Sequence, residues 1–327
     1  MIISKTPLRI SFCGGGSDIA SFYRKHGGCV ISTSIDKYIY ISSVRSFNPD
    51  VTLLKYSVVE ETRDLSDIRH PVFKAMLNEF DMPGYEINST SDIPAGTGLG
   101  SSSTFTVGLS NLLRTRRGEN PDKETLANDA CRIEIDVLGE PIGKQDQYAA
   151  VFGGFNFMKF SGSGVNVNRV RIHPDTISEL QYCSVLCYTG NPRESAKIIE
   201  SQVEKFNKGQ NEEALDKTKE LTKDMVVALE KGNIDEAGRL LDVSWDYKKQ
   251  FSSKITNPQI DALYNAAKDN GAIGGKVSGA GGGGFMYFIC RYDRKYDVAR
   301  TLQGMGARVT DYMFEPEGVI SWRYPHE

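Results

Sequence analysis

The first part of the chain is dominated by positions that alternate between hydrophobic and polar. Over residues 2–13, Leu8, Ile10 and Phe12 fall on one face, while Arg9 and Ser11 fall on the other. This two-residue period is typical of a half-buried β-strand. Similar runs predict further strands over residues 29–35, 38–45, 51–56 and 84–88. The N-terminal region is therefore expected to form a sheet.

Hydrophobic residues elsewhere recur every three or four positions, which predicts amphipathic helices. Ser17 is the expected N-cap of the first helix, over residues 18–26. Further helices are predicted over residues 70–80, 104–117, 122–138, 194–207, 212–231, 234–245 and 258–270. Strands are expected over residues 182–188, 285–291, 308–314 and 319–324.

The grouping of these elements bears on the fold class. Strands cluster first, helices follow, and strands return at the end, which favours an α+β fold over a doubly wound sheet. A chain of 327 residues exceeds the size that one hydrophobic core usually reaches. We therefore predict two domains, residues 1–185 and residues 186–327, separated near the turn at 189–193.

Composition narrows the possible partners. Hydrophobic residues make up 39% of the chain and charged residues 25%, as in globular proteins. A net charge of -3 and the lack of a polybasic run give no reason to expect a nucleic-acid partner. The N-terminus has no apolar signal core and no apolar span long enough for a membrane helix, so we expect no membrane and a cytoplasmic location. The six scattered cysteines are expected to be free core residues. The sequence makes no prediction of the oligomeric state.

Residues 94–103 carry the strongest chemical signal. They read Pro-Ala-Gly-Thr-Gly-Leu-Gly-Ser-Ser-Ser and lead into a predicted helix. Free amides at a helix N-terminus attract anions, and glycines let the backbone close on a phosphate group. The serine hydroxyls could bind a phosphate or a Mg²⁺ ion. A plain capped loop is the alternative. The spacing fits neither the Walker loop nor the G-x-G-x-x-G fingerprint, which argues against a dinucleotide oxidoreductase.

Two other stretches are rich in glycine. Residues 14–18 read Gly-Gly-Gly-Ser-Asp before a predicted helix, so they form either a second anion or hydroxyl site or a simple turn. Residues 274–284 contain seven glycines in eleven positions. Because ordering so flexible a run is entropically costly, we expect a ligand or another backbone to approach it closely.

Two acidic residues are candidates for chemistry. Glu134 lies on a predicted helix, where most acidic side chains simply face water. Asp146 lies between polar neighbours and the apolar run that follows, which suggests a carboxylate held near a buried surface.

Residues 7–18, 94–103, 134–147 and 279–284 resemble, in the same order, the sequence motifs of the GHMP kinases, which include galactokinase, mevalonate kinase and homoserine kinase. The resemblance implies transfer of a phosphoryl group from ATP to a hydroxyl, with Mg²⁺. It also implies a two-domain α+β fold: an N-terminal domain like the second domain of ribosomal protein S5, a ferredoxin-like C-terminal domain, and an active site between them.

The resemblance also implies roles for individual residues. Asp146 matches the catalytic aspartate, which the homoserine kinase branch lacks, and Arg9 matches the basic residue beside it. Ser102 and Glu134 match the Mg²⁺ ligands. The expected ATP-binding residues are Pro94, Gly96, Gly98, Leu99, Gly100, Ser101, Ser102 and Ser103. The expected substrate-binding residues are Arg9, Gly14, Gly15, Gly16, Ser17, Asp18, Asp146, Gly279, Gly281 and Gly282.

The substrate is indicated by one departure from the galactokinase pattern. Galactokinases read Gly-Glu-His-Thr-Asp where this chain reads Gly-Gly-Gly-Ser-Asp at residues 14–18. This version most resembles the D-glycero-D-manno-heptose 7-phosphate kinases. Loss of a carboxylate removes repulsion towards a sugar phosphate. We therefore expect phosphorylation of the anomeric hydroxyl of that heptose phosphate, for nucleotide-activated heptose and surface glycan synthesis.

The distal phosphate of such a substrate needs a cation, for which Arg24, Lys25 and Arg45 are candidates. One alternative is another anomeric kinase, for fucose or galactose. A second is a non-catalytic sugar and ATP sensor on the same fold, although the presence of Asp146, Glu134, Ser102 and Arg9 together argues against it.

Overall fold

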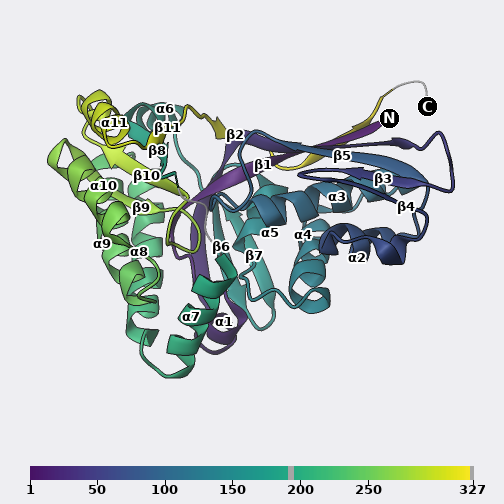
Figure 1. The fold of residues 1–327 in the computed structure, drawn as a ribbon. Coiled ribbons are helices and arrows are strands. Elements are labelled where there is room, and N and C mark those ends of the chain that lie inside the picture. The colour runs from purple at the N-terminus through teal and green to yellow at the C-terminus, as the bar shows by residue number, and fades with distance from the viewer. Residues whose placement is uncertain (191–194, 325–327) are drawn as a thin grey trace.

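The protein contains two β-sheets that lie side by side, each covered by its own helices (Figure 1). The structure is a computed structural model and describes residues 1–190 and 195–324. Helices and strands occupy separate layers and the sheets are largely antiparallel, so the α+β prediction is confirmed.

The first sheet is built around two long antiparallel strands, β1 (Ile2–Cys13) and β2 (Gly28–Arg45). Its main path runs β13-β1-β2-β5-β3-β4, and β6 and β12 also pair with β2. The remaining strands of this sheet are β3 (Thr52–Lys55), β4 (Val59–Thr62), β5 (Tyr85–Ser91), β6 (Asn156–Ser161), β7 (Gly164–Arg169), β12 (Phe314–Glu315) and β13 (Ile320–Arg323). Because β13 pairs with β1, the end of the described chain returns to its beginning (Figure 1).

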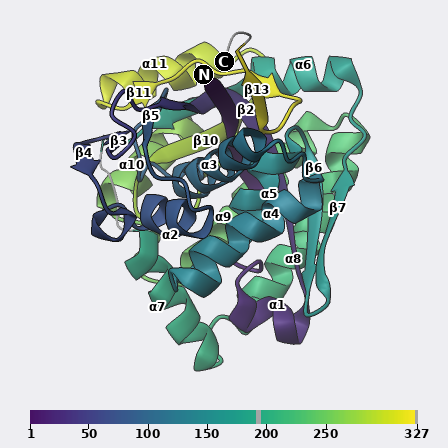
Figure 2. The same ribbon diagram turned by 90° about the vertical axis from the view of Figure 1, so that its right-hand side faces the viewer.

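One face of the first sheet is covered by helices (Figures 1 and 2). They include α2 (Pro71–Glu79), α3 (Ser101–Arg117), α4 (Lys123–Cys131) and α5 (Gln145–Phe152). Helix α3 packs directly on β1 and β2, and its buried Leu109 and Leu112 join Ile10 and Ile41 in one core. The first turn of α3 lies against the middle of β1, where the Thr104 hydroxyl donates to the carbonyl of Pro7 at 3.4 Å.

The second sheet has the strand order β11-β8-β10-β9, with every pair antiparallel. In chain order this is 4-1-3-2, the ferredoxin-like arrangement expected from the sequence. The strands are β8 (Ser184–Tyr188), β9 (Ala272–Val277), β10 (Phe285–Cys290) and β11 (Arg308–Val309). The nearby helices are α6 (Pro174–Cys183), α7 (Ser195–Asn207), α8 (Glu212–Glu230), α9 (Ile234–Gln250), α10 (Pro258–Asp269) and α11 (Lys295–Gly304).

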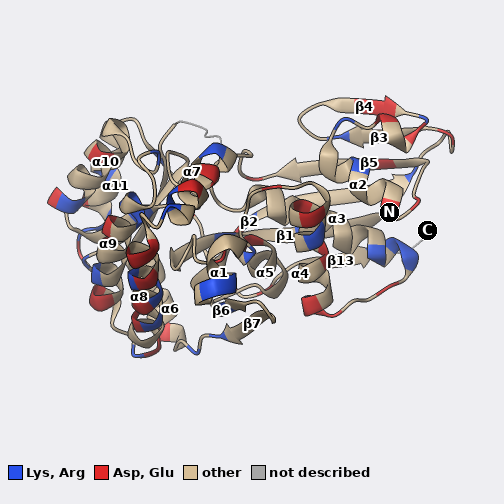
Figure 3. Cartoon of the chain, turned by 90° about the horizontal axis from the view of Figure 1, so that it is seen from below, with Lys and Arg blue, Asp and Glu red and all other residues tan. Residues whose placement is uncertain are grey.

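Helix α9 packs against β9 and α8. The buried Trp245 and Phe288 form part of the core between helices and sheet. Acidic and basic residues are mixed along α8 and α9 (Figure 3), which agrees with the small net charge.

The predicted N-cap at Ser17 is wrong. Helix α1 spans Ala20–His26, its N-cap is Ile19, and no side chain caps it. The Ser17 hydroxyl instead donates to the carbonyl of Gly14 at 2.8 Å and accepts from the amide of Cys29 at 3.1 Å. Ser17 therefore holds the glycine turn against β2.

Other element boundaries also differ from the predictions. The predicted helix over 122–138 is α4 followed by a π-helical segment, η2 (Arg132–Val137), which contains Glu134. The strand expected from residue 182 starts at Ser184, because residues 182 and 183 end α6. Residues 274–277 of the glycine-rich run belong to β9. The single strand expected over 308–314 is replaced by two short ones, β11 and β12.

The division into residues 1–185 and 186–327 stays a prediction. It falls within β8, and β12 and β13 belong to the first sheet although they follow residue 186. Residues 191–193 of the predicted turn lie outside the described residues. All six cysteines are buried and free. In the part of the chain that the structure describes, no helix is long and apolar enough to cross a bilayer, and the expected cytoplasmic location stays a prediction.

Candidate active site

A cleft of ≈ 210 Å³ lies between the two sheets and their helices. Its walls come from β1 and the turn after it, the loop before α3, η2, the start of α5, the helices α7 and α9, and the loop after β9. Segments far apart in the sequence thus meet at one place.

The loop before α3 presents the helix N-terminus to this cleft. Gly96, Gly98 and Gly100 have positive φ angles of 75°, 89° and 82°, which L-residues with side chains rarely adopt. Gly100 is the N-cap of α3, a helix of 17 residues. Because glycine has no side chain, no side chain at the N-cap accepts hydrogen bonds from the first amides of the helix. Such a terminus attracts anions, so the loop has the geometry expected of a phosphate-binding site.

Arg9 and Asp146 form a two-point ion pair in the cleft. The Nε of Arg9 donates to Oδ1 of Asp146 at 2.7 Å, and its Nη2 donates to Oδ2 at 2.8 Å. The Arg9 side chain is 3% exposed and that of Asp146 24%, so the carboxylate reaches solvent while its partner is buried. A two-point contact with a guanidinium fixes both the position and the plane of a carboxylate.

Arg9 also connects the surrounding loops. Its Nη1 donates to the carbonyl of Gly98 at 2.8 Å and to the Ser278 hydroxyl at 3.5 Å. The backbone amide of Arg9 donates to the carbonyl of Leu99 at 3.0 Å. One buried side chain therefore ties Asp146 to both glycine-rich loops.

Asp18 is a second carboxylate in the cleft and is 2% exposed. Its Oδ1 accepts from the amide of Gly16 at 2.9 Å, and its Oδ2 accepts from the amide of Gln145 at 3.2 Å. The Gln145 side chain donates to both oxygens at 3.1 Å. Burial raises the pKa of Asp18, and the nearby charge of Asp146 acts in the same direction.

Glu134 is buried beside the serine-rich start of α3. Its Oε1 accepts from the Ser102 hydroxyl at 3.0 Å and its Oε2 accepts from Gln147 at 2.6 Å. Burial raises the pKa of Glu134 to about 7, although these hydrogen bonds oppose the shift. A desolvated carboxylate next to a hydroxyl is a suitable pair of oxygen ligands for a divalent cation, so these residues fit Mg²⁺.

Most of the residues predicted from the sequence line this cleft. They are Arg9, Gly15, Gly16, Asp18, Gly96, Gly98, Gly100, Ser101, Ser102, Ser103, Glu134, Asp146 and Gly279. Their assignment to ATP, metal or substrate stays a prediction.

The other predicted residues are not among the described lining residues. They are Gly14, Ser17, Pro94, Leu99, Gly281 and Gly282. Leu99 is fully buried. A Cβ on Gly14 would lie 2.0 Å from the carbonyl oxygen of Cys29, and one on Gly281 would lie 2.9 Å from Ile255. The two glycines therefore allow close packing behind the cleft.

Five polar lining residues were not predicted: Glu140, Gln145, Ser195, Gln202 and Lys248. Gln145 directly precedes Asp146, so its proximity was available from the sequence. Gln202 and Lys248 lie on helices whose pattern indicates only a core-facing stripe, and no motif marks them. Of the cations suggested for a distal phosphate, Arg24 lines a neighbouring pocket. Arg45 lies over the ring of Tyr85, in the β2–β5 part of the first sheet.

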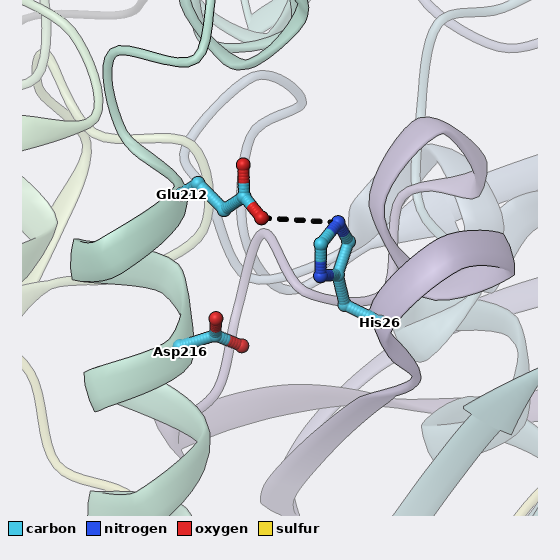
Figure 4. A group of neighbouring side chains, drawn as sticks. All are labelled: His26, Glu212 and Asp216. Atoms are coloured by element: carbon cyan, nitrogen blue, oxygen red, sulfur yellow. Dashed lines mark ion pairs between the residues drawn. The ribbon is translucent and has the colours of Figure 1, made fainter.

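A cluster outside the cleft joins α1 to α8 (Figure 4). His26 Nε2 lies 3.4 Å from Oε1 of Glu212, and Asp216 lies nearby. Asp216 also pairs with Lys219 at 2.9 Å, and Lys219 donates to the carbonyl of His26. These contacts account for the cluster as a link between two helices.

Comparison with known proteins agrees with this geometry. Residues 68–154 match the GHMP kinases N terminal domain, and residues 225–308 match the GHMP kinases C terminal domain. The chain is 34% identical to the D-glycero-alpha-D-manno-heptose 7-phosphate kinase of Campylobacter jejuni, over 98% of this chain and 99% of that protein.

The chain is also similar in structure to solved sugar kinases. A D-glycero-D-manno-heptose 1-phosphate kinase from Bacteriodes thetaiotaomicron superposes with a TM-score of 0.82, at 27% identity over 100% of both chains. Lactococcus lactis galactokinase complexed with galactose superposes with a TM-score of 0.75 at 20% identity, over 99% of this chain and 95% of that chain, a likeness of fold alone.

Proposed function

Because the chain belongs to the GHMP kinase family, whose members transfer a phosphoryl group from ATP, we propose that it phosphorylates the anomeric hydroxyl of D-glycero-D-manno-heptose 7-phosphate. The observation that carries this proposal is the two-point contact between Arg9 and Asp146 beside the glycine loop. The contact supports a carboxylate that is fixed in orientation and still reaches the cleft.

In the proposed reaction, Asp146 positions the acceptor hydroxyl and takes its proton. The hydroxyl oxygen forms a bond to the γ-phosphorus of ATP as the bond to the leaving oxygen breaks, and ADP departs. Arg9 acts chiefly by holding Asp146, since its guanidinium donates to that carboxylate, to Gly98 and to Ser278. Positioning of this kind lowers the barrier by avoiding reorganisation during the reaction.

The phosphates of ATP are assigned to the loop at residues 96–103. The uncapped amides at the start of α3 favour the negative charge of the phosphate oxygens. Ser102 and Glu134 would hold Mg²⁺, which supplies positive charge to the phosphate oxygens. Because burial raises the pKa of Glu134 to about 7, the Glu134 carboxyl is partly protonated near neutral pH, and a bound cation would favour its ionised form.

The choice of sugar is supported by two observations. The chain resembles a heptose 7-phosphate kinase along its whole length, and glycines line the cleft at positions 15 and 16. Asp18, held by Gly16 and Gln145, is placed to accept hydrogen bonds from sugar hydroxyls.

A substrate panel tests the proposal. Purified protein with ATP and Mg²⁺ is given heptose 7-phosphate, the unphosphorylated heptose, L-fucose or D-galactose, and release of ADP is measured. We expect heptose 7-phosphate to give the highest kcat/KM, and phosphorus NMR of the product to show a second phosphate on the anomeric carbon. A higher kcat/KM for free fucose or galactose would overturn the proposal.

A further inference from the structure

Lys248 lines the cleft but has no part in the mechanism above. It lies near the end of α9 and is only 5% exposed. Removing an ammonium group from water is costly, so proteins rarely bury lysine without a compensating role.

The Lys248 ammonium is held at a defined place. It donates to the carbonyl of Gly15 at 3.1 Å and to Oε1 of Gln202 at 3.4 Å. Gln202 is fixed in turn, because its Nε2 donates to the carbonyl of Ala280 at 3.1 Å. The ammonium therefore lies against the turn after β1, and Gly15, Gln202 and Ala280 all line the cleft with it.

The described lining of the cleft contains side chains of both charges. Its described lining contains four acidic residues: Asp18, Glu134, Glu140 and Asp146. The basic residues of the same described lining are Arg9, which holds Asp146, and Lys248, which lies against the turn after β1. A sugar substrate with a phosphate group far from its reacting hydroxyl is bound more tightly when a cation contacts that phosphate group.

The turn beside Lys248 packs closely against Phe251 and Gln202. Gly16 has a φ of +105°, and a Cβ there would lie 3.2 Å from the ring of Phe251 and 3.5 Å from Oε1 of Gln202. A side chain at this position would press on Gln202, whose Oε1 accepts from the Lys248 ammonium. Gly16 also leads to Asp18, which is bonded by Gln145, the neighbour of Asp146. A series of contacts through Gly15, Gly16, Asp18 and Gln145 therefore connects Lys248 to Asp146.

We propose that Lys248 binds the distal phosphate of the sugar substrate and selects phosphorylated over unphosphorylated sugars. The proposal rests on the proposed function, because it assigns part of the same cleft. A lysine that only joined α9 to the turn would matter equally for both kinds of sugar.

The test compares wild type, Lys248→Met and Lys248→Arg with heptose 7-phosphate and with the unphosphorylated heptose. Methionine keeps most of the packing volume, and arginine keeps the charge. Lys249→Met is the matched control, since Lys249 pairs with Asp246 on the same helix and does not line the cleft. Circular dichroism and thermal melting establish that each variant is folded.

We expect Lys248→Met to lower kcat/KM for heptose 7-phosphate by about 10- to 100-fold, the usual effect of losing a hydrogen bond to a charged group. The kcat/KM for the unphosphorylated heptose should stay within about threefold of wild type by the same reasoning. Lys248→Arg should restore part of the preference, and Lys249→Met should keep all of it.

The outcomes separate this proposal from the proposed function. A wild type without preference for the phosphorylated sugar contradicts the proposed function itself. If the wild type has that preference but Lys248→Met lowers both rates equally, or neither, the assignment of Lys248 is overturned. Loss of the preference in Arg24→Ala instead would place the distal phosphate in the neighbouring pocket.

Discussion

The loops at residues 96–100 and 279–284 are both rich in glycine, but their glycines face different surroundings. A Cβ on Gly100 would lie 3.4 Å from Oδ2 of Asp146 and 3.4 Å from Cγ of Arg9, which is ordinary contact with side chains of the cleft. A Cβ on Gly284 would lie 2.2 Å from the carbonyl oxygen of Thr97. The glycine of the first loop lies beside side chains of the cleft. The glycine of the second loop allows two backbone segments to pack in direct contact.

Backbone hydrogen bonds explain this difference. The amide of Phe285 donates to the carbonyl of Thr97 at 2.9 Å, and the amide of Thr189 donates to the carbonyl of Gly284 at 2.9 Å. The second loop thus joins the second sheet to the first loop. Glycine content alone does not identify a ligand site, because close packing of backbones requires the same residue.

The largest expected effect is a loss of stability in Gly284→Ala. The new Cβ would overlap a backbone oxygen, and alanine is strained at the φ of +82° found there. We expect the free energy of unfolding to fall by about 3 kcal/mol or more, the range typical of backbone strain combined with a steric clash. Urea denaturation followed by tryptophan fluorescence measures this. A loss below about 1 kcal/mol would show that the contact between the loops is not tight.

The first loop differs from the second in its charged surroundings, which makes stability near Ser102 depend on pH. Burial raises the pKa of Glu134 to about 7 in the folded protein, whereas an exposed glutamate, as in the unfolded chain, has a pKa of 4.5. A raised pKa stabilises the fold below pH 4.5, and this contribution is lost as the pH rises through 7. Its size is about 3 kcal/mol. Glu134→Gln cannot ionise, so without Mg²⁺ it should gain stability relative to wild type between pH 5 and pH 8.

Urea denaturation at several pH values, with chelator present, measures this gain. Glu204→Gln is the control, because Lys208 lowers the pKa of the Glu204 carboxyl. The stability that a lowered pKa supplies is already present above the ordinary value, so this control should stay parallel to wild type from pH 5 to pH 8. A Glu134→Gln curve that is also parallel would contradict the burial assigned to Glu134.

The smallest expected change in stability is that of alanine variants at the two ends of α3. Comparing Gly100→Ala with Gly118→Ala separates an effect of backbone strain from an effect on catalysis. Gly100 has a φ of 82° and Gly118 a φ of 77°, and a Cβ on Gly118 would meet nothing within 4 Å. Alanine at either position should cost about 1–2 kcal/mol of unfolding free energy, because both backbones are left-handed. Only Gly100→Ala should also lower kcat, by about tenfold, because its Cβ would contact the side chains of Arg9 and Asp146. Equal kcat values in the two variants would show that Gly100 serves the fold alone.

Local patterns singled out the loop at residues 94–103, which lines the cleft, because alternating glycines and the serine triplet stand together in ten residues. They also predicted the amphipathic helices. Strand β9 was missed because glycine is rare in strands, yet a Cβ on Gly274 would lie 2.1 Å from the carbonyl oxygen of Gly238. Glycine at that position lets α9 lie close to the sheet.

Apart from the Arg9–Asp146 pair, which the resemblance implied, the contacts between distant segments described below were not predicted from the sequence. Gln145 bonds Asp18 across 127 positions, and Lys248 bonds Gly15 across 233. Gly15, Asp18 and Gln145 lie in stretches that the sequence singled out, but spacing along the chain does not show which of their side chains meet. The contact of Lys248 with Gly15 also depends on how the helices of the second sheet pack against the first. The strand β6 is different, since its buried Met158 and Phe160 alternate with Lys159 and Ser161, a pattern from which a strand could have been predicted.

The most direct test of the account is the rate of ADP release by Asp146→Asn with heptose 7-phosphate as acceptor. Asparagine keeps the shape of the side chain but cannot take the proton of the hydroxyl. We predict that kcat falls by about 100-fold or more, while the affinity for an ATP analogue, measured by calorimetry, changes less than about threefold because Asp146 lies outside the loop assigned to the phosphates. A variant that keeps kcat within about threefold of wild type would contradict the assignment of Asp146 as the base.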